Sequence, residues 1–159
     1  MVKHANETAD CGITLATLDP DDLICAGYGD SFFANAEGER TQTGFIITMT
    51  TGKALAGRAD ASIQDWASRR TKRHVRSTLA GEAEVCDVVT DHAYFMAAFF
   101  SRIVDRQKPS SSIMPKISCY VATDCRSLYD AVSKVMPSFT ENRTLIDVLS
   151  IRESLHTGD

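Results

Sequence analysis

Hydrophobic and polar positions in the first part of the chain follow the pattern of β-strands. Apolar, aromatic and β-branched residues fill the ranges 23–33, 44–50 and 62–68, and turn-forming sequences separate these ranges. Three successive strands joined by short turns are typical of an antiparallel meander. The preceding range 1–22 is polar, acidic and aperiodic, and it ends in the turn-like Leu18-Asp-Pro-Asp-Asp22. We therefore expect a leader or linker at 1–22 and one folded domain over 23–159.

The period of the pattern changes after the third predicted strand. From 77 to about 104 the apolar residues recur at the spacing of one helix face. A further strand is predicted at 117–123, and helices at 125–135 and 142–155. The order β-β-β-α-β-α-α predicts an α/β fold, a mixed sheet with helices packed on it. The residues expected on the buried face of the long helix are Val85, Val88, Val89, His92, Phe95, Met96, Phe99 and Ile103.

Composition bounds the class of protein. With 159 residues, 43% of them hydrophobic and 24% charged, the chain fits one compact domain. The longest apolar stretch, 94–100, is far too short to cross a bilayer, and the N-terminus lacks an apolar signal core. We therefore expect neither a membrane partner nor secretion. An odd number of cysteines without a Cys-x-x-Cys pair favours a reduced compartment inside the cell, the cytoplasm or the nucleus. The cysteines are Cys11, Cys25, Cys86, Cys119 and Cys125.

Positive charge is concentrated in one segment although the net charge is −4. That net charge by itself speaks mildly against a nucleic-acid partner. The range 57–76, however, holds six basic residues against two acids. Its most basic part, 68–78, joins the third strand to the long helix and is either a solvated turn or a surface for phosphates. Ser77 or Thr78 could also cap the helix. The residues predicted to bind nucleic acid are Arg69, Arg70, Lys72, Arg73, Arg76, Ser77 and Thr78.

Three carboxylates stand at the ends of predicted elements. Asp30 lies late in the first strand, Glu82 in the first turn of the long helix, and Asp124 directly after the fourth strand. Parallel strands joined by a crossover helix usually lie close in a sheet, so the three acids could converge. Converging carboxylates repel one another unless a cation neutralises them, and oxygen ligands favour Mg²⁺. Alternatively, the two aspartates are structural caps of a turn or helix, and Glu84 competes with Glu82 for the position that faces the sheet.

The remaining residues that could carry chemistry have simpler interpretations. Trp66 and His92 are expected in the core, and Cys86 and Cys119 are expected to be small buried hydrophobes. Cys125 carries a thiol beside the third acid, but no histidine stands nearby in sequence to activate it.

Six short blocks occur in an order that resembles a known family. They are Tyr28-Gly-Asp-Ser-Phe-Phe-Ala34, Arg40-Thr-Gln-Thr-Gly-Phe45, Trp66-Ala-Ser-Arg-Arg70, Arg76-Ser-Thr-Leu-Ala-Gly-Glu-Ala-Glu84, Thr123-Asp-Cys-Arg-Ser-Leu128, and Arg143-Thr-Leu-Ile-Asp-Val148 with Ile151-Arg-Glu153. Together they resemble the ribonuclease H domain of copia-class (LTR) retrotransposon polyproteins, from about Leu23 to Leu155. Aligning the shared serine at Ser77 puts the family's catalytic glutamate on Glu82 rather than on Glu84.

The resemblance implies a ribonuclease H-like fold and hydrolysis of the RNA strand of RNA–DNA hybrids. It makes Asp30, Glu82 and Asp124 the catalytic and metal-binding residues, which would hold two Mg²⁺ or Mn²⁺ ions against the scissile phosphate. RNA would be told from DNA through its 2′-hydroxyls, largely across the minor groove. The implied partners are the RNA–DNA hybrid and the reverse transcriptase of the parent polyprotein.

The chain departs from the family pattern in three places. Cys125 stands where the family has an asparagine, and Phe32 stands where it usually has a second acid. The family's fourth carboxylate follows one more strand, whereas this chain ends at Asp159 before such a segment. We therefore expect a C-terminally truncated domain, without its last strand and helix, with reduced or no activity. The alternatives are a nucleic-acid-binding remnant without catalysis and a small signalling or scaffold domain. A transposase or integrase of similar fold is disfavoured, because it would place its helix-borne glutamate after the second aspartate, whereas Glu82 precedes Asp124.

Overall fold

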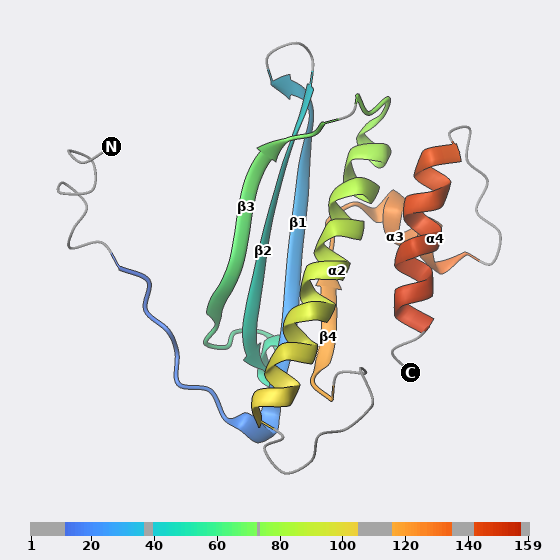
Figure 1. Ribbon diagram of the computed structural model, residues 1–159. Coiled ribbons are helices and arrows are strands. Elements are labelled where there is room, and N and C mark those ends of the chain that lie inside the picture. The colour runs from blue at the N-terminus through green and yellow to red at the C-terminus, as the bar shows by residue number, and fades with distance from the viewer. Residues whose placement is uncertain (1–11, 37–39, 73, 105–115, 135–141, 157–159) are drawn as a thin grey trace, which may run out of the picture.

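A four-stranded mixed sheet forms the centre of the molecule (Figure 1). The computed structural model describes residues 12–36, 40–72, 74–104, 116–134 and 142–156. The strands are β1 (Leu23–Ala36), β2 (Arg40–Thr51), β3 (Ser62–Arg70) and β4 (Ser118–Ala122), in the order β3-β2-β1-β4. Neighbours among β1, β2 and β3 are antiparallel, and β4 is parallel to β1. The predicted α/β architecture, a meander followed by a parallel strand, is confirmed.

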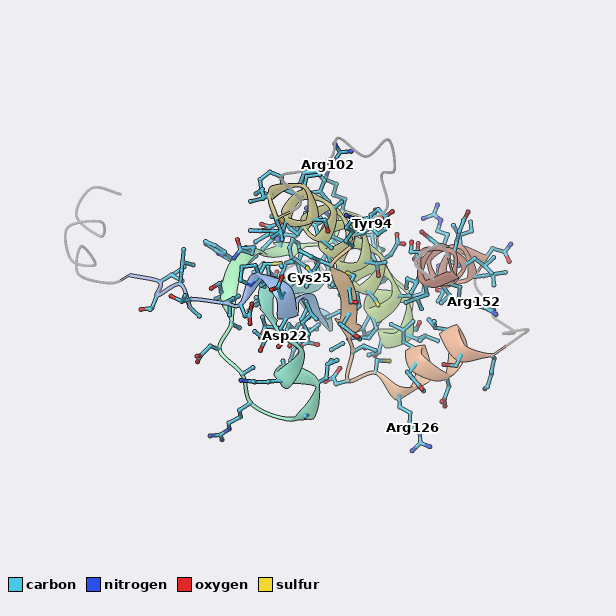
Figure 2. The ribbon with its side chains drawn as sticks, turned by 90° about the horizontal axis from the view of Figure 1, so that it is seen from below. Asp22, Cys25, Tyr94, Arg102, Arg126 and Arg152 are labelled. Carbon is cyan, nitrogen blue, oxygen red and sulfur yellow. The ribbon has the colours of Figure 1, made fainter. Side chains whose placement is uncertain are left out.

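Helices cover one face of this sheet. α2 (Thr78–Val104) packs on the strands, and the Ser77 hydroxyl caps it by accepting a hydrogen bond from Ala80 N at 3.1 Å. α3 (Arg126–Ser133) and α4 (Asn142–His156) pack beside α2, as the view along the sheet shows (Figure 2). Two short 3-10 helices, η1 (Pro20–Asp22) and η2 (Gly52–Ala56), precede β1 and follow β2. Among the described residues, none of the helices has the length and apolar character that crossing a bilayer requires.

Small side chains allow α2 to pack closely against β1. Cys25 is fully buried beneath the helix, with its sulfur 3.4 Å from the carbonyl oxygen of Ala93. A Cβ added at Gly27 would lie 2.5 Å from Val89 Cγ1, much closer than packed carbon atoms approach. The helix turns short side chains toward the sheet every four residues, at Val85, Val89, Ala93, Ala97 and Ser101. Glycine on the strand and short side chains on the helix therefore set the spacing of the two layers.

The buried face of α2 differs from the predicted one in its C-terminal half. Val85 and Val89 are buried as expected, but Phe95, Phe99 and Ile103 are exposed, Phe95 to 65%. The prediction followed hydrophobicity alone. The close approach of α2 to β1 admits only short side chains between the layers, so Phe95, Phe99 and Ile103 lie on the outer side of the helix.

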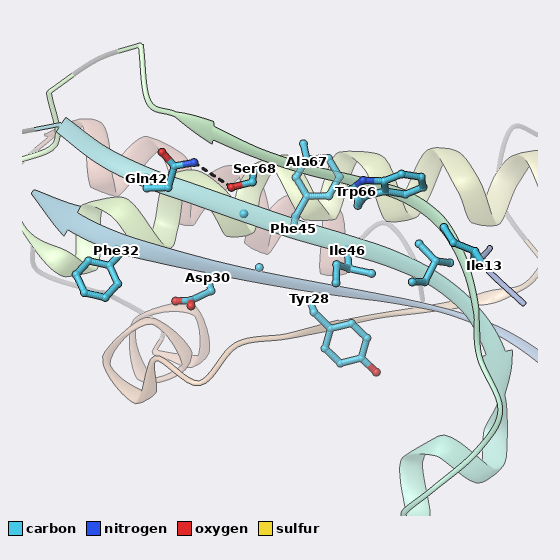
Figure 3. Close-up of a pocket in the computed structure, with 13 residues that line it drawn as sticks. Ile13, Tyr28, Asp30, Phe32, Gln42, Phe45, Ile46, Trp66, Ala67 and Ser68 are labelled. Carbon is cyan, nitrogen blue, oxygen red and sulfur yellow. Dashed lines mark hydrogen bonds between the residues drawn. The ribbon is translucent and has the colours of Figure 1, made fainter. Parts of the chain in front are cut away.

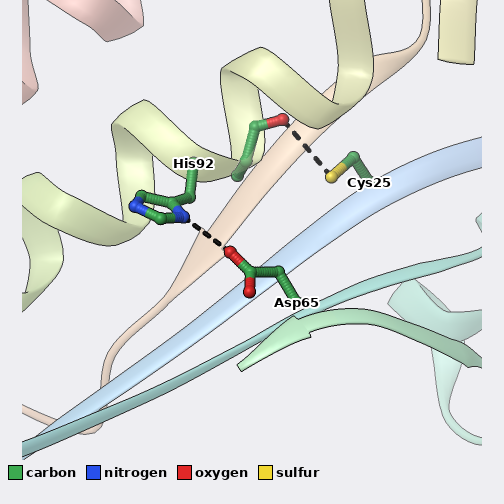
Figure 4. Close-up of polar contacts among 4 residues, drawn as sticks. Cys25, Asp65 and His92 are labelled. Carbon is green, nitrogen blue, oxygen red and sulfur yellow. Dashed lines mark hydrogen bonds and ion pairs between the residues drawn. The ribbon is translucent and has the colours of Figure 1, made fainter. Parts of the chain in front are cut away.

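Two further residues expected in the core are less buried than predicted. Trp66 on β3 is 59% exposed, on the sheet face opposite α2. His92 is half-buried on α2, where its Nδ1 lies 2.7 Å from a carboxylate oxygen of Asp65 (Figure 4) and its ring packs against Phe45. The prediction for Trp66 was wrong, and that for His92 holds only in part. Alternation along a strand and spacing along a helix identify faces, but not which of the faces another element will cover.

A second hydrophobic cluster joins the three helices. It is formed by Ala83, Cys86, Leu128, Ala131, Val148 and Ile151. Cys86 is buried in it, as expected, whereas Cys119 is only half-buried and packs against the main core. Cys125 stands at the N-cap position of α3 and packs against the same cluster. The cluster therefore fixes the start of α3, and with it Asp124, relative to α2.

The segment before β1 lies along the domain. Its residues 12–19 have no regular secondary structure, and Asp19 caps η1 by accepting a hydrogen bond from Asp21 N at 3.0 Å. Leu18 packs against the core, and Ala16 N donates to Ser62 Oγ at 2.9 Å. Residues 1–11 of the predicted leader lie outside the described residues, so the boundary between 22 and 23 stays a prediction.

Candidate metal centre

The parallel strand pair places two aspartates at the same edge of the sheet. β1 and β4 are paired through Tyr28 and Ala122, and Asp30 and Asp124 each follow two residues later. Parallel strands point the same way, so the carboxylates arrive at this edge from neighbouring strands. Both aspartates are exposed.

Glu82 reaches the same place from α2, one turn inside the helix rather than in its first turn. The helix comes close to β1 here because Gly81 has no side chain: a Cβ at this position would lie 2.8 Å from Ser31 Oγ. Glu82 Oε1 accepts hydrogen bonds from Ser31 N at 3.1 Å and from Ser31 Oγ at 2.7 Å. Ser31 therefore holds the orientation of Glu82. No sequence pattern marks Ser31 as a site residue, and the only signal is its place next to Asp30.

The three predicted carboxylates form one cluster. Asp30, Glu82 and Asp124 each offer an oxygen, and these oxygens all lie within 4.8 Å of one another. The convergence expected from the sequence is therefore present. Glu84, the competing candidate, is half-buried on another side of the helix, where it lines a hollow between β3 and α2. The catalytic and metal-binding roles of the three acids stay predictions.

The carboxylate of Glu82 is buried and would be stabilised by a positive charge. Its side chain is 4% exposed, and Oε2 is buried without a hydrogen-bond partner among the described residues. Burial raises the pKa of Glu82; the two Ser31 hydrogen bonds oppose this rise, while the charges of Asp30 and Asp124 add to it. A buried oxygen without a partner is unfavourable, and more so when it is charged. A divalent cation would supply the missing partner, and the all-oxygen donor set suits a hard ion such as Mg²⁺ or Mn²⁺.

Basic side chains lie at the same end of the sheet as the acids. Asp30 is paired with Gly44 and Gly44 with Ser68, so Arg69 and Arg70 follow directly after the residue in line with Asp30. Two strand spacings separate their backbones from β1, which is roughly 10 Å. Arg69 and Arg70 belong to β3 rather than to the connecting turn, which corrects the predicted segment. The ladder with β2 extends the strand to Arg70.

The other residues predicted to bind nucleic acid lie between β3 and α2. Lys72, Arg76, Ser77 and Thr78 are exposed, whereas Arg73 lies outside the described residues. The Ser77 oxygen accepts the helix-capping hydrogen bond, and its hydroxyl hydrogen can still be donated. A hollow of about 200 Å³ opens beside this segment, and its polar lining includes Arg69, Arg70, Thr71, Lys72 and Glu84.

An apolar hollow of about 750 Å³ lies on the sheet face opposite α2 (Figure 3). A hydrogen bond from Gln42 Nε2 to Ser68 Oγ, 2.9 Å long, lies at one side, and Asp30 is part of the lining. Sequence reasoning missed this surface, although larger residues alternate with glycine or serine at 27–32 and thereby distinguish a face of large side chains from a face of small ones. Its exposed large side chains are Ile13, Tyr28, Phe32, Ile46 and Trp66.

Comparison with known proteins gives a distant structural likeness and no sequence match. No family model matches the chain, and no curated protein matches it. The foamy viral protease-reverse transcriptase in complex with an RNA/DNA hybrid is 12% identical, with a TM-score of 0.49 over 90% of this chain and 17% of that chain. The native prototype foamy virus protease-reverse transcriptase is 13% identical, with a TM-score of 0.47 over 92% of this chain and 18% of that chain. The chain spans less than a fifth of the length of either neighbour.

Proposed function

We propose that the chain is a ribonuclease H-like domain of copia-class retrotransposon origin, which hydrolyses the RNA strand of RNA–DNA hybrids. The observation that carries the proposal is the cluster of Asp30, Glu82 and Asp124, in which one buried oxygen of Glu82 is left without a partner. The six ordered blocks of the sequence supply the substrate class, since they resemble this family from about Leu23 to Leu155. The parallel pairing of β1 and β4 supports the same reading, because it brings the acids of two blocks to one edge.

The residues of the cluster have separate tasks in this mechanism. Two Mg²⁺ or Mn²⁺ ions, when bound, would activate the attacking water and stabilise the leaving oxygen. Asp30 and Asp124 offer exposed oxygens just beyond the paired stretch of β1 and β4, where a phosphate can also reach. Ser31 occupies Oε1 of Glu82 with two hydrogen bonds, which leaves Oε2 as the oxygen for ligation.

The basic segment would hold the hybrid beside these acids. Arg69, Arg70, Lys72 and Arg76 lie at the same end of the sheet as Asp30, where contacts to phosphates would supply affinity that is independent of sequence. Discrimination of RNA from DNA would come from the 2′-hydroxyls. In an intact element the domain would work beside the reverse transcriptase of the same polyprotein, inside the cell.

Cleavage of a labelled hybrid tests the proposal. We expect Mg²⁺- or Mn²⁺-dependent cleavage of the RNA strand, reduced about 100-fold or more in Asp30→Asn and in Asp124→Asn, which corresponds to roughly 2.7 kcal/mol of transition-state stabilisation. Glu84→Gln is the matched control, because Glu84 lies on the same helix but outside the cluster. Cleavage that persists in a chelator, or that is equal in Asp30→Asn and the native chain, contradicts the proposal.

A second candidate is a nucleic-acid-binding remnant without catalysis. Phe32, which is exposed on β1, favours it, because the resembling family usually has an acid at that position. Within the described residues the cluster holds three acids, and a fourth acid is the family's pattern. Salt-sensitive binding of the hybrid without metal-dependent cleavage would support this candidate over the enzyme. Absence of both binding and a metal effect would favour a scaffold domain.

A further inference from the structure

Two cysteines face each other across β1 and β4, apart from the acidic cluster. Cys25 and Cys119 are paired in register, and both pack in the core beneath α2. In-register residues of neighbouring strands point to the same side of a sheet, so the two sulfurs meet there. The interaction of the two thiols raises the pKa of Cys25 and lowers the pKa of Cys119.

The spacing of the strands suits a covalent bond between these sulfurs. Neighbouring strands lie about 4.8 Å apart, and disulfides join residues whose Cα atoms are about 4.4–6.8 Å apart. We propose that Cys25 and Cys119 form a redox-active dithiol, which a peroxide oxidises to a disulfide across β1 and β4. This inference is independent of the nuclease proposal.

The two thiols differ in access and in acidity. Cys25 is fully buried, and its thiol donates a hydrogen bond to the Ala93 carbonyl oxygen at 3.4 Å (Figure 4). The neighbouring Cys119 thiol and burial keep the pKa of Cys25 far above the ordinary thiol value. The neighbouring Cys25 thiol lowers the pKa of Cys119, which is only half-buried. Cys119 is therefore the attacking thiolate, and Cys25 is the resolving thiol.

The oxidation has two steps. The Cys119 thiolate attacks one oxygen of hydrogen peroxide, the O–O bond breaks, and hydroxide leaves, so that Cys119 becomes a sulfenic acid. The Cys25 sulfur then attacks the Cys119 sulfur and displaces the sulfenic hydroxyl group, which leaves as water with the Cys25 proton. The first hydroxide takes up the proton that Cys119 had released. Two thiols and one peroxide thus give one disulfide and two waters.

The bond would also fix the strand register on which the acidic cluster depends. Cys25 precedes Asp30 by five residues, and Cys119 precedes Asp124 by five residues. A link between the two cysteines prevents β4 from sliding along β1. It also closes a long loop of chain, which restricts the unfolded state. We expect the oxidised protein to unfold at a temperature at least about 5 °C higher than the reduced protein.

Thiol counting on the full chain tests the proposal. The reduced chain, alkylated in denaturant with iodoacetamide, should carry five adducts, and after brief hydrogen peroxide treatment three, because the chain has five cysteines. Peptide mapping should find one linked pair, Cys25 with Cys119, which dithiothreitol opens. Cys119→Ala and Cys25→Ala should abolish the pair and the rise in unfolding temperature. Cys86→Ala, a buried cysteine of the other cluster, should retain both.

Each other outcome overturns the proposal. Five adducts after peroxide show that no disulfide forms. A linked pair of other cysteines, or overoxidised Cys119 beside alkylated Cys25, shows that Cys25 does not resolve the sulfenic acid. A Cys25–Cys119 disulfide without a rise in unfolding temperature refutes the fixing of the strand register. None of these measurements uses cleavage or binding of nucleic acid, and those on the native chain require no variant to fold.

Discussion

The buried carboxylate of Glu82, whose Oε2 has no hydrogen-bond partner among the described residues, should make the stability of the fold depend on pH and on bound metal. Burial raises the pKa of Glu82 above the ordinary value of 4.5. The folded chain therefore holds this proton more tightly than the unfolded chain does. The resulting stability is fully present below the unfolded-state pKa and is lost as the pH rises through the folded-state pKa. At neutral pH and without a cation, the carboxylate of Glu82 thus weakens the fold.

The substitution Glu82→Gln tests this reasoning in the metal-free protein. Glutamine keeps an oxygen for the Ser31 hydrogen bonds but carries no charge. We expect it to raise the unfolding temperature relative to the native chain at pH 7, and to lose this advantage below about pH 4, where both side chains are neutral. Thermal unfolding by circular dichroism, in a chelator from pH 3.5 to 8, measures the difference. The same pH dependence in Glu84→Gln would contradict the assignment to Glu82.

Divalent cations should make the native chain more stable than Glu82→Gln, the reverse of the order expected without metal. A ligand that binds only the folded state at 100 times its Kd adds about 2.7 kcal/mol to the free energy of unfolding. We expect Mg²⁺ or Mn²⁺ to stabilise the native chain in this way and to have little effect on Glu82→Gln or Asp30→Asn, each of which removes a ligand charge. Thermal unfolding over a range of metal concentrations measures it. An equal shift in all three proteins would show that the ions bind elsewhere.

At the level of helices and strands, sequence patterns predicted the elements well but not which surface each one buries. The four strands, the long helix with its Ser77 cap and the parallel pairing of the fourth strand are confirmed, although the first three strands extend beyond their predicted ends. Phe95 and Trp66 were expected inside and are exposed, because hydrophobicity does not report how close two layers come. That distance depends on glycine and short side chains from segments far apart in sequence, such as Gly27 and Val89.

The contact between β1 and α2 can be tested by a double-mutant cycle. Gly27→Ala places a Cβ against Val89 Cγ1, and overpacking of this kind lowers the free energy of unfolding by about 1–3 kcal/mol. Val89→Ala removes the opposing methyl groups, so we expect the double variant to recover at least about 1 kcal/mol of the combined loss. Urea unfolding of the four proteins measures it. Val88→Ala is the control, since Val88 is not among the nearest neighbours of that Cβ, and additivity at Val89 would refute the close contact.

In the molecule as a whole, the acidic cluster lies where three elements from distant parts of the chain meet. Its convergence was predictable because Asp30 and Asp124 each follow closely on the paired residues of strands that a crossover helix makes parallel neighbours. The role of Ser31 was not, since its hydrogen bonds to Glu82 arise only when α2 packs on β1. The basic residues were predictable as a charged segment, but their position relative to the acids follows from the register of β3.

Basic residues lie at both ends of the sheet, so variants at each end can show whether the hybrid binds at the Asp30 end or responds only to the total charge of the protein. Arg69 and Lys72 are exposed at the end that carries Asp30, whereas Lys53 and Arg58 are exposed at the opposite end, near η2. If the first pair contacts phosphates of the hybrid, the double variant Arg69→Gln/Lys72→Gln should weaken binding. It should also make the plot of log affinity against log salt concentration shallower by roughly 0.9 for each contact.

The matched control for Arg69→Gln/Lys72→Gln is Lys53→Gln/Arg58→Gln, which removes the same net charge from the far end of the sheet. Fluorescence anisotropy with an RNA–DNA hybrid at several salt concentrations, in Ca²⁺ to prevent turnover, measures both slopes. We expect the far-end variant to keep the native slope. Equal loss in the two variants would mean that total charge governs the affinity, and the edge that holds Asp30 and Arg69 would then have no special part in recognising the hybrid.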